Sequence, residues 1–214
     1  MSFYPQTGQL LETIKIFNKK IFNLDYHNFR LNKSREKLWA FKDFIDLKNF
    51  LHPPDEKLYK VRVLYDQVIK NIEYLPYQKK SIKSFKLINS NISYPYKFAD
   101  RKNLEKLYSL KEGADDIIII KDQKITDTFA ANLAFFKDNK WLTPASPLLP
   151  GTTREKLLKE KKIYPAIITI KDLKKIKKIA IMNCMIGFKE IKEKNPILNF
   201  EPLEYFFSVR CKNL

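Results

Sequence analysis

Short apolar segments separated by polar turns restrict this chain to a fold rich in β-strands. Residues 115–128, DDIIIIKDQKITDT, contain a strand of four isoleucines, a turn and a second strand. Residues 131–144, ANLAFFKDNKWLTP, continue as a hairpin around Asp138 and Asn139. Strand-length runs bounded by turn residues are typical of antiparallel strand pairs. The second half of the chain is therefore expected to consist mainly of strands.

The first half is expected to combine two strand pairs with one helix. LLETIKIF and KIFNLDYH predict a hairpin with its turn at residues 18–20, and residues 59–77 alternate as a second strand pair. Between them, residues 27–41 carry apolar and basic residues at helical spacing, with Phe29 on the apolar side. This pattern predicts an amphipathic helix that runs toward residue 52, where two prolines end it.

The domain boundary is expected after Pro76, where the polar run QKKSIKS interrupts the pattern. Beyond it, the patterns predict a strand at residues 84–91 and a helix at residues 100–113 that is ended by Gly113. They then predict a turn that opens a helix at residues 148–164, and a late buried strand, or a strand and a turn, at residues 177–191. The whole chain is predicted to be α+β. A small N-terminal α/β domain would span residues 1–77, a linker residues 78–83, and a larger strand-rich domain residues 84–214.

Composition narrows the possible classes of function. The 214 residues, 44% of them hydrophobic, suffice for a folded core. No apolar stretch reaches the roughly 18 residues that cross a bilayer, and the N-terminus lacks the pattern of a secretion signal. We therefore expect a cytoplasmic protein with no membrane partner. Two cysteines, Cys184 and Cys211, and two histidines argue against a structural disulfide and a zinc site, so no metal is expected.

The formal charge of +17 invites a nucleic-acid interpretation, but its distribution argues against one. The basic residues are mostly lysines spread along the chain, whereas base-edge and bidentate phosphate recognition favours arginine. A solvated surface explains the charge better than a nucleic-acid partner does.

The segment LLPGTTREKLL contains a candidate anion site. A loop ends at Gly151, and Thr152 and Thr153 then open a predicted helix. The start of such a helix offers unpaired backbone N–H groups, two hydroxyls and the positive end of the helix dipole, which suit a phosphate. The alternative is that a threonine only caps the helix while Gly151 allows the bend.

Two more groups could share a site with that turn. Asp127 ends a predicted strand within ITDTFAANLAFF, and Lys97 precedes it by thirty residues. A lysine, a carboxylate and a phosphate cradle are what a pyridoxal phosphate site needs: an amine to hold the cofactor, an acid for its pyridine nitrogen, and a seat for its phosphate. Spacing alone does not select Lys97 among the many lysines.

A family resemblance does select it. ITDTFAANLAFFKDNKWLTPASPLLPGTTREKL resembles the signature of the class IV aminotransferases and lyases, pyridoxal phosphate enzymes of fold type IV. Upstream, LLETIKI is similar to the family's Phe-Glu-Thr strand and DYHNFRLNKS to its His-x-x-Arg-Leu helix; downstream, IMNCMIGFKEI is similar to its last cofactor-facing turn. The matches keep their order over most of residues 10–191.

The resemblance implies a role for each matched residue. Lys97 would be the catalytic lysine that holds pyridoxal 5'-phosphate, and Asp127 would face the pyridine nitrogen. The other implied cofactor-binding residues are Arg30, Asn132, Thr152, Thr153, Asn183 and Cys184. For Asn132, Asn183 and Cys184, purely structural roles in satisfying backbone groups and in packing are equally open. The resemblance also implies a homodimer.

Two departures from the family pattern bear on the chemistry. The family usually has Glu where this chain has Asp127, which is one methylene shorter. Cys184 stands where Ser or Thr is commoner in the family. A thiol therefore replaces the hydroxyl that would form a good hydrogen bond to phosphate.

Within the family, YKFADRKNL is closer to the aminodeoxychorismate lyases, because Arg101 follows the lysine by four residues. The resemblance thus implies elimination of pyruvate from 4-amino-4-deoxychorismate to give 4-aminobenzoate for folate synthesis. Arg62 and Arg101 would bind substrate carboxylates, although Arg62 could equally be a surface residue. An aminotransferase for branched-chain or D-amino acids is the alternative, and a non-catalytic protein that binds an anionic partner on the same fold is a weaker one.

Overall fold

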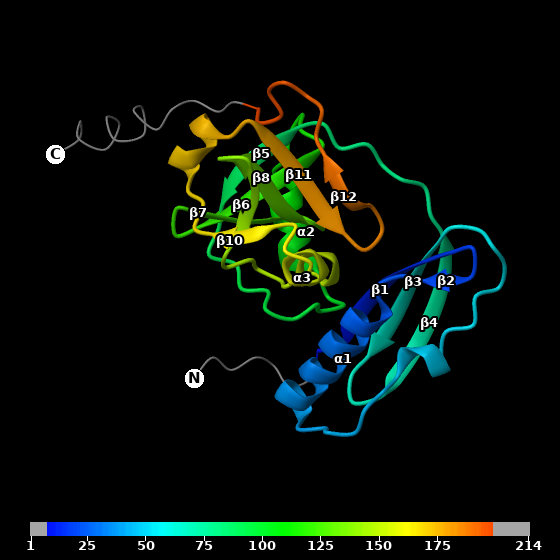
Figure 1. Ribbon diagram of the computed structural model, residues 1–214. Helices are drawn as coiled ribbons and strands as arrows, with labels where there is room; N and C mark the ends of the chain where they lie inside the picture. The colour runs from blue at the N-terminus through cyan, green and yellow to red at the C-terminus, as the bar shows by residue number, and fades with distance from the viewer. Residues whose placement is uncertain (1–7, 199–214) are drawn as a thin grey trace.

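The computed structural model describes residues 8–198, which form two sheets with three helices packed against them (Figure 1). Cys211 lies outside the described residues. The expected α+β class, rich in strands, is confirmed. No helix within residues 8–198 has the length and apolar character needed to cross a membrane.

The first sheet has four antiparallel strands in the order β2-β1-β3-β4. Its strands are β1 (Leu10–Phe17), β2 (Lys20–Ile21), β3 (Tyr59–Tyr65) and β4 (Ile69–Pro76). Because side chains alternate along a strand, β1 turns Leu10, Ile14 and Ile16 into the core beneath helix α1 (Leu24–Trp39). The opposite face of this sheet borders the candidate active site described below.

The predicted hairpin at the start of this sheet is shorter than expected. Its turn forms at Asn18 and Lys19, both with positive φ (49° and 58°), but the second strand has only two residues. Asn23 then adopts a left-handed conformation (φ 55°) and α1 begins at the next residue. The strand pair at residues 59–77 is confirmed.

The predicted helix was wrong at its C-terminal end and in placing Phe29 on the apolar side. It ends at Trp39 because Ala40 is left-handed (φ 60°), and only a 3-10 turn, η1 (Leu47–Asn49), follows. Phe29 is 63% exposed, whereas Arg35 is buried and donates to Asp43 and to the carbonyl of Gln67. The rest of the apolar side is present as expected, since Leu31 is buried and Leu38 and Trp39 pack against the same core.

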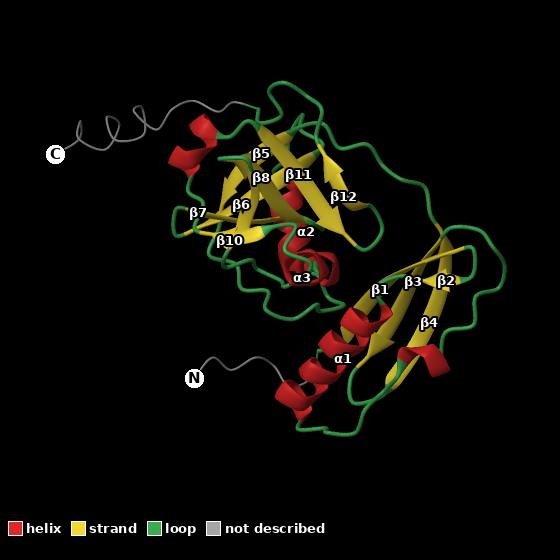
Figure 2. Cartoon of the chain, viewed as in Figure 1, coloured by secondary structure: helices red, strands yellow, loops and turns green. Residues whose placement is uncertain are grey.

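The second sheet has eight strands, six of them in the order β10-β9-β8-β7-β6-β5, with β11 paired to β8 and β12. Its strands are β5 (Phe85–Asn89), β6 (Asp116–Lys121), β7 (Lys124–Thr128), β8 (Asn132–Lys137), β9 (Lys140–Pro144), β10 (Tyr164–Ala166), β11 (Lys178–Asn183) and β12 (Gly187–Glu190). A core of aliphatic side chains and Phe85 and Phe135 lies within it. Figure 2 shows how strongly strands predominate here.

The hairpins expected in this half are present. Their turns use pairs of residues with positive φ, Asp122 with Gln123 and Asp138 with Asn139, as two-residue hairpin loops require. A 3-10 segment, η2 (Ile170–Lys175), precedes β11.

Two short helices complete this half: α2 (Lys102–Ser109) and α3 (Thr152–Lys159). Gly113 does not end α2 as predicted, because the helix stops at Ser109 and Leu110 donates back to Leu107 and Tyr108. Helix α3 lies against α1 of the first sheet and against β11 of the second, and so joins the two halves (Figure 1).

Candidate active site

A cavity of about 450 Å³ is lined by residues of both sheets and of the loops between them. Nine of the ten sequence-predicted site residues line it: Arg30, Arg62, Lys97, Arg101, Asp127, Asn132, Thr152, Asn183 and Cys184. The tenth, Thr153, is buried beside it, and its hydroxyl accepts a hydrogen bond from Asn23 Nδ2 at 3.1 Å. The fold thus gathers residues that are up to 154 positions apart in the sequence (184 − 30 = 154).

Backbone pairing with β1 fixes Lys97. Its carbonyl accepts from the N–H of Leu11 at 2.8 Å, Phe98 bridges Leu10, and Ala99 donates to the carbonyl of Gln9 at 2.8 Å. Burial, reinforced by Arg30 and Arg101, lowers the pKa of Lys97 to about 7. A substantial fraction of this amine is therefore neutral, and nucleophilic, near neutral pH.

Asn132 explains the polar residues inside ITDTFAANLAFF. Asp127 and Asn132 face each other across the β7–β8 turn, and Asn132 Nδ2 donates to Asp127 Oδ1 at 2.7 Å. The same amide donates to the carbonyl of Leu149 (2.9 Å) and accepts from Gly151 N–H (3.1 Å). Asn132 therefore ties the acid to the loop that opens α3.

Asp127 is held on both carboxylate oxygens. Oδ1 accepts from Asn132, and Oδ2 accepts from the N–H of Leu149 at 2.9 Å. Burial raises the pKa of Asp127 to about 6, although these two hydrogen bonds favour the ionised form. A carboxylate oxygen has lone pairs for more than one donor, so Asp127 can still accept a hydrogen bond from a ligand in the cavity.

The loop at Gly151 leaves no space for a side chain. A Cβ on Gly151 would lie 2.1 Å from Asn132 Oδ1, so only glycine lets the loop approach the amide this closely. The next residue, Thr152, starts α3 and lines the cavity, which places the first N–H groups of that helix at its edge. The arrangement suits an anion, as the sequence predicted.

Glu12 and His27 belong to the site but were not predicted as site residues. Glu12 takes an inward position on β1 and is completely buried. Arg30 binds it with two hydrogen bonds, Nε to Oε1 at 2.8 Å and Nη2 to Oε2 at 2.6 Å, and His27 Nδ1 lies 2.6 Å from Oε2. The available signal was an acid at a core position of LLETIKIF, with a histidine and an arginine three residues apart on the following helix.

This cluster fixes the charge of its members. Burial opposes ionisation of Glu12, but Arg30 and His27 outweigh it and lower the pKa of Glu12 to about 2. Burial also opposes the charged form of His27, yet hydrogen bonds with Cys184 and Glu12 raise the pKa of His27. Glu12 thus orients the Arg30 guanidinium at the cavity wall.

Replacing Glu12 with Gln should lower the free energy of unfolding at neutral pH by about 3 kcal/mol, because a buried guanidinium loses its counter-charge. The pKa of Glu12 is lower in the folded chain (about 2) than its ordinary value of 4.5. Its contribution is therefore complete above about pH 4.5 and is lost as the pH falls toward 2. Urea unfolding from pH 7 down to pH 3 should show the wild type and the variant converging on the acid side.

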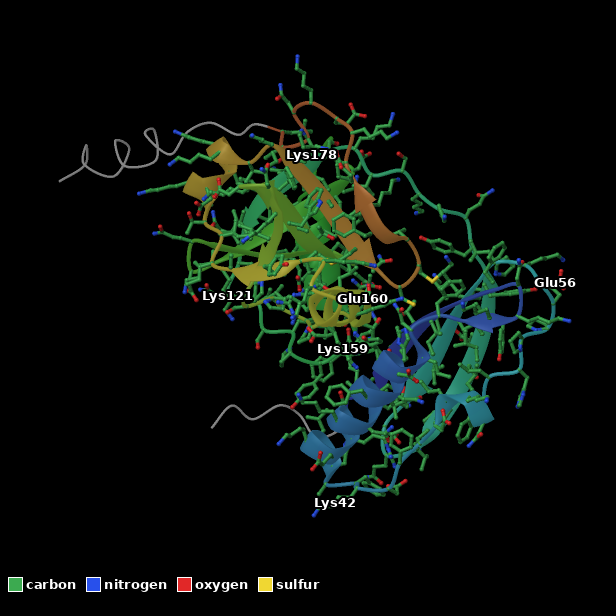
Figure 3. The ribbon with its side chains drawn as sticks, viewed as in Figure 1. Lys42, Glu56, Lys121, Lys159, Glu160 and Lys178 are labelled. Carbon is green, nitrogen blue, oxygen red and sulfur yellow. The ribbon has the colours of Figure 1, made fainter. Side chains whose placement is uncertain are left out.

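Glu56→Gln is the matched control, since Glu56 is exposed at the edge of the molecule (Figure 3). This variant should change the free energy of unfolding by no more than about 0.5 kcal/mol. A Glu12→Gln protein as stable as the wild type at pH 7 would contradict the assigned ion pair.

Positive side chains also line the cavity from β3 and from the residue that precedes α2. Arg62 and Lys60 alternate onto the cavity face of β3, with Arg62 opposite Thr13 in the sheet register. Arg101 lies with its guanidinium carbon 4.1 Å from the centre of the Phe129 ring and donates to the Phe129 carbonyl at 2.6 Å. The Nε of Arg101 is buried and has no hydrogen-bond partner among the described residues.

The turn after β11 closes the cavity. Asn183 Oδ1 accepts from the N–H groups of Met185 (2.9 Å) and Ile186 (3.1 Å), and Asn183 Nδ2 donates to the carbonyl of Ala130 at 3.1 Å. Its side chain is thus engaged in shaping this turn. Cys184 Sγ lies 3.2 Å from His27 Nε2.

Four of the lysines illustrate that positive charge is carried by separate parts of the chain. Lys42, Lys121, Lys159 and Lys178 belong to different elements and point outward at separate places (Figure 3). Of the residues that line the cavity, Arg30, Lys60, Arg62, Lys97 and Arg101 are basic, against Glu105 and Asp127. The cavity itself is therefore the feature that would attract an anion.

Comparison with known proteins identifies the family. The model of the family described as amino-transferase class IV matches residues 51–193, more than half of the chain. An uncharacterised protein of Haemophilus influenzae is 35% identical over 185 residues, which is 83% of this chain and 98% of that protein.

Solved structures share the fold. A crystal structure from Haemophilus somnus, provisionally described as a 4-amino-4-deoxychorismate lyase, is 36% identical, with a TM-score of 0.78 over 85% of this chain and 98% of that one. The pyridoxal-phosphate-bound form of a Mycobacterium tuberculosis protein, described as a hypothetical aminotransferase, is 14% identical, with a TM-score of 0.73 over 94% of this chain and 86% of that one. By its sequence and its fold, this chain belongs to the class IV aminotransferase family.

Proposed function

We propose that this protein is a pyridoxal-phosphate-dependent lyase that eliminates pyruvate from 4-amino-4-deoxychorismate and leaves 4-aminobenzoate. The observation that carries the proposal is the number of cations at the cavity. Arg30 lies toward the α3 end, while Lys60, Arg62 and Arg101 remain for the substrate. Aminodeoxychorismate carries two carboxylates, so it matches more of these cations than an amino acid with an apolar side chain would.

The residues at the α3 end fit the cofactor. The Gly151 loop, the first N–H groups of α3 and the Arg30 guanidinium would hold its phosphate. Asp127, ionised at neutral pH, would accept a hydrogen bond from the protonated ring nitrogen, and Asn132 would keep the acid in place. When bound, pyridoxal phosphate supplies an electron sink for a carbanion next to the substrate nitrogen.

Lys97 would hold the cofactor and move the protons. Because the pKa of Lys97 is lowered to about 7, its amine can both accept and return a proton near neutral pH. In the proposed elimination it takes the proton that the substrate ring loses and delivers one to the departing three-carbon unit. Arg101, stacked on Phe129, would fix a substrate carboxylate beside it.

An aminotransferase acting on branched-chain or D-amino acids is the alternative, and one contact favours it. Arg62 donates to Glu73 at 2.8 Å, and both side chains are partly exposed. If that ion pair persists with substrate bound, only Arg101 and Lys60 of the three substrate-side cations stay available, and Arg101 is the one that can bind a carboxylate in the bidentate manner. One such site matches the single carboxylate of a simple amino acid.

Two assays on the protein loaded with pyridoxal phosphate separate these reactions. With aminodeoxychorismate, we expect pyruvate and 4-aminobenzoate to form in equal amounts. With branched-chain or D-amino acids and a keto-acid acceptor, we expect turnover at least about 100-fold slower. Keto-acid formation without pyruvate release would sink the lyase proposal in favour of the aminotransferase. Absence of both activities would leave a non-catalytic protein that binds an anion.

A further inference from the structure

Cys184 ends a chain of three buried or partly buried ionisable groups that the proposed lyase reaction does not use. Its Sγ lies 3.2 Å from His27 Nε2, and His27 Nδ1 lies 2.6 Å from Glu12 Oε2. The Lys15 N–H also donates to the sulfur at 3.4 Å. Three separate elements supply these groups, since Glu12 is on β1, His27 on α1, and Cys184 follows β11. The thiol is half-buried and lines the cavity.

We propose that Cys184 is a thiolate modification site that reacts with hydroperoxides, and that its oxidation and the binding of phosphate at the start of α3 exclude each other.

The geometry makes a thiolate favourable at this position. Glu12 is already neutralised by Arg30, and His27 lies between Glu12 and the sulfur, so a proton moved from the thiol to His27 forms an ion pair inside the cluster. Burial alone would raise the pKa of Cys184, but the hydrogen bond with His27 outweighs it, and the pKa of the thiol is lowered. Arg30 acts in the same direction. An imidazolium beside a partly exposed thiol is the environment of reactive cysteines.

The oxidation balances with groups already present and one hydroperoxide. The thiolate of Cys184 attacks one peroxide oxygen, a sulfur–oxygen bond forms and the oxygen–oxygen bond breaks. The sulfur loses two electrons to the peroxide. For hydrogen peroxide, the proton of the His27 imidazolium converts the departing hydroxide to water, which leaves a sulfenic acid and a neutral imidazole.

Phosphate and an oxidised Cys184 would compete for the same space. His27 Nε2 lies 3.2 Å from the sulfur and 3.5 Å from the Thr152 hydroxyl, so both are near the same imidazole nitrogen, and Thr152 opens the helix proposed to hold phosphate. An oxygen added to the sulfur occupies this region. Conversely, a bound phosphate dianion would repel the negative charge of the Cys184 thiolate and would block access to the sulfur. This second half of the inference rests on the proposed phosphate cradle, whereas the reactivity of the thiol does not.

The test is an alkylation profile on a Cys211→Ser background, which leaves Cys184 as the sole cysteine. The full-length protein without added cofactor reacts with iodoacetamide between about pH 6 and about pH 9, with glutathione as the reference thiol, and adducts are counted by intact mass. At each pH, the alkylation rate of Cys184 is divided by that of glutathione. This ratio should be at least about fivefold larger at the acid end of the range than at the alkaline end. Cys184→Ser gives the background.

Three further measurements complete the test. Inorganic phosphate should slow alkylation at least about threefold compared with chloride at equal ionic strength. Hydrogen peroxide followed by dimedone should add one dimedone per chain. His27→Asn should restore a pH profile parallel to that of glutathione; if that variant does not fold, the profile of the parent still decides.

A profile parallel to glutathione in the parent protein, or no dimedone adduct, would overturn the thiolate site. Alkylation unaffected by phosphate would overturn the exclusion. The profile requires neither cofactor nor substrate, so its failure is distinguishable from a failure of the lyase proposal.

Discussion

Replacing Lys97 with Ala should reduce pyruvate release from aminodeoxychorismate by at least about a thousandfold, because the buried amine is assigned both the attachment of the cofactor and the movement of protons. The cavity contains a second lysine, Lys60. Because Lys60 is on β3, whereas the segment of Lys97 pairs with β1, we do not expect Lys60 to take over the role of Lys97. The measurement is kcat for pyruvate with the variant saturated with pyridoxal phosphate.

Lys102→Ala is the matched control, since the Lys102 side chain is 81% exposed and forms a long ion pair with the exposed Asp100 (3.7 Å). Its kcat should remain that of the unmodified protein. If Lys97→Ala retained more than about a tenth of the activity, another group would have to supply the amine.

Replacing Asp127 with Asn should lower kcat by about a hundredfold or more, since the negative charge proposed to face the ring nitrogen is lost while the volume of the side chain is kept. The substitution also places an amide NH₂ where either Asn132 Nδ2 or the Leu149 N–H now donates, so one hydrogen bond of the site is lost. The measurement is kcat together with cofactor occupancy from the absorbance of the bound ring.

Asp116→Asn controls for the loss of a buried acid. Asp116 is also buried, accepts from the N–H groups of Ile117 and Phe129, and has a pKa raised by burial, yet it does not line the cavity. This variant removes a charge that burial disfavours and retains the oxygen that accepts both N–H groups, so kcat should be kept. Equal losses of kcat in the two variants would indicate that Asp127 acts only by supporting the structure, and that an Asp in the family's Glu position does not reach the ring.

The hairpins could be predicted from sequence because their causes are local. Three of the turns use Asn, Asp or a neighbouring polar residue at positive φ, and the alternation on either side specifies the strands. The end of α1 could not be read in this way. Residues 43–52 continue with apolar residues that suit a helix, but Ala40 turns left-handed and Arg35 is bound by Asp43 across the loop.

Most of the site was predictable from the family motifs, although Glu12 and His27, which also lie in matched motifs, were given no role there. Nine of the ten proposed residues line one cavity, including Lys97, which spacing did not distinguish from other lysines. Glu12 and His27 were missed because their importance depends on contacts with Arg30 and Cys184, which are distant in sequence and meet only when α1 packs against β1 and the β11–β12 turn.

Locating the bound cofactor tests the central claim most directly. The purified protein is loaded with pyridoxal phosphate, reduced with sodium borohydride to fix the cofactor to the amine that holds it, digested, and mapped by peptide mass spectrometry. The account predicts the phosphopyridoxyl group on Lys97 and its absence from the exposed lysines. A group found on another lysine, or on none, would contradict it.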